Sequence, residues 1–365
     1  MSHPVFPVRT NVRRIAREGE KIMKKIIALA LSALMLLGLT ACGASEPQTA
    51  TTAAAAAEVA TQAVTEAATA SAGEKYVVGV CQLVPHDALD AATQGFCDKL
   101  TELLGEDNVE INVQVAAGDS ATCAPIVNAF VAEEVDLIMA NATPALQAAS
   151  QATADIPILG TSVTEYGVAM GIEDFSGTIG GNISGTSDLA PLDQQAQMVK
   201  DWFPDAKNVG LLYCSAEPNS QYQVDTVQKY LEELGFTCTQ YPFADSNDMA
   251  AVTQTAADNS DVIYVPTDNT VASGAGIVDG ICQPAGIPVI AGEEGICGGC
   301  GVATLSISYY DLGVKTAEMA AQILTGEADI STMPVSYADT FTPKYNAAIC
   351  EALGITPLEG YEAIG

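Results

Sequence analysis

Hydrophobic and polar positions follow two alternating periods along the chain from Tyr76 onward. Short apolar runs, which predict buried strands, alternate with stretches whose apolar residues recur every three or four positions, which predict helices. In the first half these patterns predict strands at 76–81, 109–115, 135–140 and 156–159, and helices at 88–104, 121–133 and 143–153. Such an order is typical of βαβ units around a parallel sheet.

A glycine-rich stretch at 173–187 interrupts this alternation, which then resumes. Strands are predicted at 208–213, 236–241, 262–265 and 288–290, and helices at 192–202, 221–234, 248–257 and 271–283. The chain is expected to cross back near 302–306, before a helix at 311–324. We therefore expect an α/β protein with two Rossmann-like, doubly wound lobes joined by a multi-strand hinge. Residues 75–186 plus 307–330 are assigned to the first lobe, and 187–306 plus 331–365 to the second. A ligand would lie between the lobes, where the carboxyl ends of the strands meet.

The N-terminal region has the pattern of an export signal. Two lysines precede the apolar run 26–39, which ends in the sequence Leu-Thr-Ala-Cys at Cys42. This pattern predicts a lipoprotein signal peptide at 23–41, with Cys42 lipidated and the protein anchored on the extracellular face of the cell membrane. The alternative is an ordinary signal with a chance cysteine.

Two flanking segments are interpreted separately from the folded part. Residues 1–22 place several basic residues ahead of Met23, so we interpret them as a mis-called start. Residues 42–74 are rich in alanine and threonine and contain no aromatic residue. They are predicted to form a disordered tether, with an alanine-rich helix as the alternative.

The charge balance restricts the partners. The chain has a net charge of −31, and every arginine lies before Cys42. An acidic surface of this kind repels nucleic acid, so no nucleic-acid partner is expected. Without arginine, no bidentate guanidinium clamp is available for a phosphate or dicarboxylate ligand.

Five segments together carry a resemblance to a known family. They are 77–82, 142–145 (Ala-Thr-Pro-Ala), 185–188 (Gly-Thr-Ser-Asp), 264–273 (Tyr-Val-Pro-Thr-Asp-Asn-Thr-Val-Ala-Ser) and 307–313 (Ile-Ser-Tyr-Tyr-Asp-Leu-Gly). In this order and spacing, the chain resembles the substrate-binding lipoproteins of ABC importers. It is similar to the branch of the type I periplasmic-binding fold that handles tryptophan, tyrosine and related aromatic compounds. The resemblance implies a monomer that captures a small ligand and delivers it to an ABC permease.

A free amino acid presents a carboxylate, an ammonium and a side chain, and each needs partners when buried. For the carboxylate we expect the helix start at Ala142 and Thr143, with Ser162 and Thr164 in the next loop. Thr143 alternatively only caps its helix.

For the ammonium, acidic and polar side chains of the second lobe are expected. The candidates are Asp188, Asp268 and Glu293, with Asn269 either holding a ligand oxygen or ordering its loop. Asp268 alternatively caps the helix that follows it.

The ligand side chain is expected to meet aromatic rings and polar strand ends. The candidates are Tyr166, Tyr222, Tyr309, Gln82 and Asn219. Asn219 alternatively caps its helix. His86, one of two histidines, is interpreted as a rim or surface residue.

Catalysis is not expected, because no partner histidine for a serine nucleophile, no Walker loop and no dinucleotide fingerprint is present. No cofactor and no metal site is predicted. The alternative readings are an exported redox or metal-handling protein that uses Cys297 and Cys300 in a flexible Cys-Gly-Gly-Cys loop, and a ligand sensor on the same fold.

Overall fold

The computed structural model describes residues 75–364, which belong to one compact unit. The expectations for the start site, the signal peptide, Cys42 and the tether lie outside the described residues.

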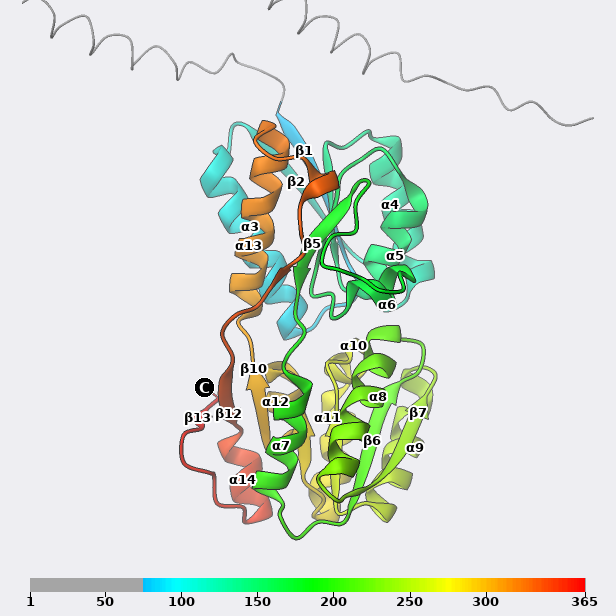
Figure 1. Cartoon of the computed structure of the whole chain (residues 1–365), viewed down its shortest axis with the longest axis vertical. Helices are drawn as coiled ribbons and strands as arrows, with labels where there is room; N and C mark the ends of the chain where they lie inside the picture. Colours follow the sequence, from blue (N-terminus) through cyan, green and yellow to red (C-terminus); the bar gives the residue numbers. More distant parts are fainter. Residues whose placement is uncertain (1–74, 365) are drawn as a thin grey trace, which may run out of the picture. The chain divides into compact units, whose positions relative to one another are not determined.

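The described chain contains two sheets, and the expected α/β class is confirmed (Figure 1). The first sheet is parallel throughout, and its strands run in the order β11 (Ser336–Tyr337), β5 (Ile183–Ser187), β4 (Ile158–Thr161), β3 (Leu137–Asn141), β1 (Tyr76–Gln82) and β2 (Val109–Val115). Every residue of β3, β4 and β5 is buried, as expected for strands covered on both faces.

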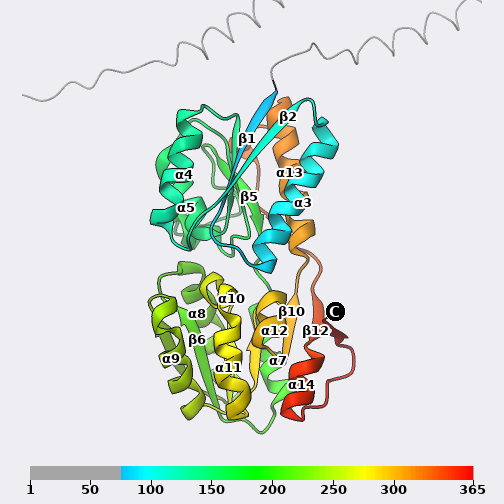
Figure 2. The same ribbon diagram turned by 180° about the vertical axis from the view of Figure 1, so that it is seen from behind.

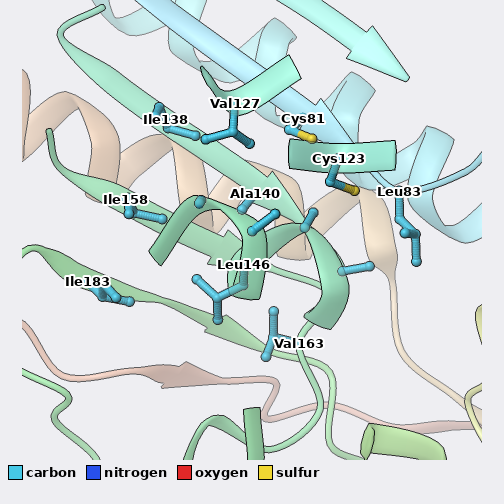
Figure 3. Packing of buried hydrophobic residues seen from close by; sticks show 14 of the residues in the cluster. Cys81, Leu83, Cys123, Val127, Ile138, Ala140, Leu146, Ile158, Val163 and Ile183 are labelled. Atoms are coloured by element: carbon cyan, nitrogen blue, oxygen red, sulfur yellow. The ribbon is translucent and has the colours of Figure 1, made fainter. Parts of the chain in front are cut away.

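Helices cover both faces of the first sheet. They are α3 (Asp87–Leu104), α4 (Ser120–Ala132), α5 (Thr143–Ala152), α6 (Tyr166–Met170) and α13 (Tyr309–Thr325). One face packs on α4 and α5 through Cys123, Val127 and Leu146 (Figure 3). The other packs on α3 and α13, which lie side by side although about two hundred residues separate them in sequence (Figures 1 and 2).

The second sheet mixes parallel and antiparallel strands. Its order is β13 (Glu362–Ala363), β12 (Thr342–Tyr345), β10 (Ala303–Ser306), β9 (Val289–Ala291), β8 (Val262–Val265), β6 (Asn208–Cys214) and β7 (Thr237–Phe243). Only the β10–β12 pair among these described strands is antiparallel.

Helices also cover both faces of the second sheet. One face packs on α7 (Leu192–Trp202), α8 (Pro218–Glu233) and α14 (Ala347–Leu353). The other packs on α9 (Ser246–Asn259), α11 (Ala275–Ala285) and α12 (Glu294–Cys300), with α11 in front of the sheet in Figure 2.

The chain passes between the two sheets at 188–191, 307–308 and 338–341. The last passage differs from the sequence boundaries, which assign 331–365 to the second lobe. A 3₁₀ turn, η1 (Ile330–Thr332), is followed by β11, whose residues pair with Thr186 and Ser187 of β5. The chain therefore stays with the first sheet until Tyr337.

Two helix predictions need correction. The helix expected at 271–283 is divided at Gly274 into α10 (Asn269–Ser273) and α11, because Gly274 has a φ of −122° and a ψ of 19°, which are not helical. The flexible loop expected around Cys297 and Cys300 is the helix α12, which Glu293 caps by accepting hydrogen bonds from the Gly295 and Ile296 amides.

Candidate functional site

Residues from both sheets line one small internal cavity. They are His86, Ala88, Leu89, Ser162, Thr164, Asp188, Asn219, Thr267, Asp268, Asn269, Ala272, Glu293 and Tyr309. The polar members follow the carboxyl ends of β1, β4, β5, β6, β8, β9 and β10. In parallel sheets this edge is where ligands bind, because successive loops converge there.

The cavity volume is about 10 Å³, which holds about one water molecule. Two hydrogen bonds cross it. The Tyr309 hydroxyl donates to Asp188 Oδ2 at 2.9 Å, and His86 Nε2 lies 3.2 Å from Asn269 Oδ1. A ligand larger than water therefore requires the cavity to widen.

A wider groove of about 1110 Å³ adjoins the cavity and shares His86, Glu293 and Tyr309 with it. Lys344 and Glu294 line this groove and form an ion pair of 2.6 Å. The groove therefore gives a path from the surface to the buried polar groups.

Four buried polar atoms on the cavity have no hydrogen-bond partner within residues 75–364. They are His86 Nδ1, Ser162 Oγ, Asp188 Oδ1 and Asn219 Oδ1. Buried polar groups are almost always paired, and an unpaired one costs about 1–3 kcal/mol. These atoms are consequently available to a polar ligand.

Three acidic side chains on the cavity are buried, and burial raises the pKa of each. Burial raises the pKa of Asp188, and interactions with the Tyr309 and Thr164 side chains and with its own backbone oppose this shift. Burial raises the pKa of Glu293 to about 7, although two backbone amides donate to its carboxylate. Burial, followed by the charge of Glu217, raises the pKa of Asp268 to about 8. A cation placed among these groups would favour their ionised forms.

Asp268 is both a cavity residue and a structural acceptor. Its Oδ1 accepts the Val271 amide at 2.8 Å, which caps α10, and its Oδ2 accepts the Cys214 amide at 2.7 Å. The capping alternative from the sequence therefore holds. Asp188, by contrast, keeps one oxygen without a partner among the described residues.

Eight of the sequence-predicted site residues line the cavity. They are Ser162, Thr164, Asp188, Asn219, Asp268, Asn269, Glu293 and Tyr309.

The other five predicted site residues do not line it. Gln82 is engaged within the first lobe, bonding Val84, Asp90 and Thr93. Tyr166 lies in the core, where its hydroxyl donates to the Thr186 carbonyl.

The remaining three lie on the elements beside the cavity. Ala142 and Thr143 are buried where β3 meets α5, and Ala142 has a positive φ of 92°. Tyr222 is half-buried on α8 and packs against the second-lobe core.

Sequence reasoning missed His86 and Glu217. His86 follows β1 and was interpreted as a rim residue, but it is one of the cavity residues. Glu217 lies behind the cavity, where its carboxylate accepts hydrogen bonds from the backbone and side chains of Asn269 and Thr270. The available signal for both was their position in the first loops after β1 and β6.

The two cysteines of the redox alternative are poorly suited to it. Cys297 and Cys300 are buried and not in disulfides, and burial raises the pKa of both thiols. Among residues 75–364, no group of three or more metal-ligating side chains comes together. The redox and metal alternative is therefore not favoured.

Comparison with known proteins gives a consistent family. A family model described as ABC transporter substrate binding protein matches residues 77–361. A tyrosine-binding protein from Clostridioides difficile is 35% identical over 283 residues, covering 77% of this chain and 81% of that protein. No helix within the described residues is long and apolar enough to span a membrane.

Two solved structures are similar over about four-fifths of the chain. One is an ABC domain from Streptococcus pneumoniae in complex with L-Trp, with 32% identity and a TM-score of 0.76, covering 80% of this chain and 100% of that one. The other is the ligand-free, open structure of a substrate-binding protein with adhesive properties from Clostridium difficile, with 38% identity and a TM-score of 0.61, covering 79% and 99%. The chain is thus structurally more similar to the complex, although its sequence is more similar to the open form.

Proposed function

The chain belongs to the ABC transporter substrate-binding family, and we propose that its ligand is a free aromatic amino acid, tyrosine or tryptophan. Proteins of this family are extracellular or periplasmic substrate-binding components and not a known class of enzyme. The type I periplasmic-binding fold agrees with this membership.

The observation that carries the proposal is the set of unpartnered buried atoms on the cavity. Asp188 Oδ1 and Asn219 Oδ1 suit an ammonium, and the Ser162 hydroxyl suits a carboxylate. The buried carboxylates around them favour a ligand with a positive group over a plain anion. Because the chain from Cys42 onward contains no arginine, the ligand carboxylate is held by hydroxyls and backbone amides.

The proposal that the ligand has an aromatic side chain is supported by the relatives of this chain. One is named for tyrosine binding, and another was solved with L-Trp. On the cavity, Tyr309 offers an aromatic ring, and Leu89 and Ala272 offer apolar surface.

The remaining parts of the proposal concern location and partners. We propose that Cys42 carries the lipid anchor, that the protein is a monomer on the outer face of the membrane, and that an ABC permease receives its ligand. Radiolabelled fatty acid should be incorporated by the wild type and not by Cys42→Ala. Incorporation by both would contradict the anchor.

Isothermal titration calorimetry tests the ligand class. The protein is first unfolded to release any ligand bound during expression, and is then refolded. L-Tyrosine or L-tryptophan is expected to bind with a Kd of about 1 μM or tighter, which corresponds to about −8 kcal/mol. L-Rhamnose, D-glucose and adenosine serve as controls and should give no heat. Binding of a control compound without binding of any aromatic amino acid would refute the proposal.

A further inference from the structure

His86 and Asn269 join the two lobes across the cavity. His86 precedes α3 on the first lobe, and Asn269 begins α10 on the second. His86 Nε2 lies 3.2 Å from Asn269 Oδ1, although 183 positions separate the two residues. This contact requires the start of α3 in the first lobe and the start of α10 in the second lobe to lie close together at the cavity.

Glu217 fixes the direction of that hydrogen bond. The Asn269 side-chain amide nitrogen donates to Glu217 Oε2 at 2.7 Å, and an ionised carboxylate only accepts. The carbonyl oxygen of Asn269 must therefore be the atom that faces His86. Since this oxygen also only accepts, the proton of the contact resides on His86 Nε2.

The other ring nitrogen is then an acceptor. In a neutral imidazole with its proton on Nε2, Nδ1 carries a lone pair. His86 Nδ1 is buried, faces no hydrogen-bond partner in the described part of the chain, and belongs to a residue on the cavity. Burial lowers the pKa of His86 and favours the neutral ring, and the nearby carboxylates of Glu217, Asp90 and Asp87 only partly oppose this effect.

Two further acceptors accompany this nitrogen. Asp188 Oδ1 is unpartnered within the described residues, and so is Asn219 Oδ1. The orientation of Asn219 is set by its amide nitrogen, which lies 3.3 Å from the Thr267 carbonyl and 3.4 Å from Glu217 Oε2. Three acceptors on one small cavity match the three N–H donors of an ammonium group.

We propose that His86 is a ligand-positioning residue, which donates from Nε2 to Asn269 across the lobes and accepts a hydrogen bond at Nδ1 from the α-ammonium of the ligand. The Glu217–Asn269 pair orients it. The imidazole ring thus binds the ligand ammonium at one nitrogen and joins the two lobes at the other. Ligand binding and lobe closure therefore depend on the same side chain. This inference rests on the proposed amino-acid ligand.

Two substitutions distinguish the roles of the two ring nitrogens of His86. His86→Gln places an amide near the position of Nε2 and removes the polar atom at Nδ1, whereas His86→Asn does the reverse. The probes are L-tyrosine, tyramine, which lacks the carboxylate, and 3-(4-hydroxyphenyl)propanoate, which lacks the ammonium.

The affinity lost in His86→Gln should depend on the ammonium group of the ligand. We expect this variant to bind L-tyrosine and tyramine at least tenfold more weakly than the wild type, with binding of the propanoate unchanged. His86→Asn should retain the preference for L-tyrosine over the propanoate. Equal weakening of all three probes by His86→Gln would overturn the inference and leave the residue a structural role.

A ligand-independent measurement keeps the inference separate from the proposed function. His3 and His86 are the two histidines of the chain, so His3→Gln leaves a single imidazole for ¹⁵N NMR spectroscopy. At neutral pH we expect the neutral form with its proton on Nε2. A proton on Nδ1, or an imidazolium, would overturn the inference even if L-tyrosine binds. Failure of the wild type to bind any amino acid, with the expected tautomer present, would refute the ammonium contact together with the proposed function.

Discussion

The Tyr309 hydroxyl donates a hydrogen bond of 2.9 Å to Asp188 Oδ2. Asp188 follows β5 at the first passage between the sheets, and Tyr309 begins α13 after the second. This bond occupies one carboxylate oxygen of a residue that lines the cavity, and Oδ1 has no hydrogen-bond partner in the described chain.

Tyr309→Phe should therefore weaken ligand binding about tenfold or more. Hydrogen bonds to charged groups contribute about 1.5–3 kcal/mol, and without this one the Asp188 carboxyl group remains protonated more readily. Calorimetry with L-tyrosine and L-tryptophan measures the change.

The neighbouring tyrosine supplies the control. Tyr310 is 42% exposed, and its hydroxyl bonds Asp98 at the surface. Tyr310→Phe should leave the Kd within a factor of two. If both variants bind like the wild type, the Tyr309 bond does not prepare Asp188 for the ligand.

Asp188→Asn should mainly reduce ligand affinity, whereas Asp268→Asn should mainly reduce stability. Both oxygens of Asp268 accept backbone amides, so the asparagine turns an NH₂ group toward an N–H donor and lowers the free energy of unfolding by about 1–3 kcal/mol. Asp188→Asn removes a charge that faces the ligand and should reduce affinity more than stability. Urea unfolding and calorimetry on both variants distinguish the two effects. A purely binding defect in Asp268→Asn would show that its capping role is minor.

Amino-acid binding should release protons near neutral pH. The raised pKa values of Glu293, about 7, and Asp268, about 8, mean that both carboxyl groups are partly protonated at pH 7 without ligand. A bound ammonium favours the ionised carboxylates and lowers these pKa values, so protons leave on binding. Affinity should consequently increase from pH 6 to pH 8, below the pH at which the ligand amine itself deprotonates.

Calorimetry in buffers of different ionisation enthalpy counts the released protons. The folded-state pKa values also have a consequence without ligand. Because they lie above the ordinary values of 3.8 and 4.5, the protonated groups stabilise the ligand-free protein most below those values, and this contribution is lost as the pH rises from there through the folded pKa values of about 7 and about 8. Proton uptake on binding would contradict a position of the ligand ammonium near these carboxyl groups.

Gly313→Ala should destabilise the first lobe by about 2 kcal/mol or more. A Cβ at Gly313 of α13 would overlap the Ala92 carbonyl of α3, where the two helix backbones touch. Overpacking of this kind costs about 1–3 kcal/mol. Gly280→Ala is the matched control, since Gly280 is exposed within α11 with nothing within 4 Å of the added Cβ. The control should be neutral or stabilising by up to about 1 kcal/mol in thermal unfolding. Equal effects would mean that the α3–α13 contact adapts.

The periodic pattern was sufficient to predict the two-lobed α/β architecture. Buried parallel strands such as Val262–Val265 carry continuous apolar runs that few other structures tolerate. The pattern failed at α12, because Gly298 and Gly299 indicate a loop, whereas the Glu293 cap and the burial of Ile296 stabilise a helix.

The position of residues after strand ends predicted much of the cavity lining. Asp188, Asp268 and Glu293 each lie within three residues of the end of a buried strand, and the sheet brings such positions together. Side-chain direction could not be predicted in this way. Tyr166 turns into the core beneath Gly160 and Gly185, and Glu217 acts through Asn269, a contact that only the folded chain creates.

The polar cavity residues lie on several loops and helix starts, which follow different strands. A substitution in one loop can therefore alter a single ligand contact while the sheets beneath keep their pairing. Transport specificity in a protein built this way can diversify in small, independent steps, and a panel of single-loop exchanges between relatives would reassign ligands without rebuilding the scaffold.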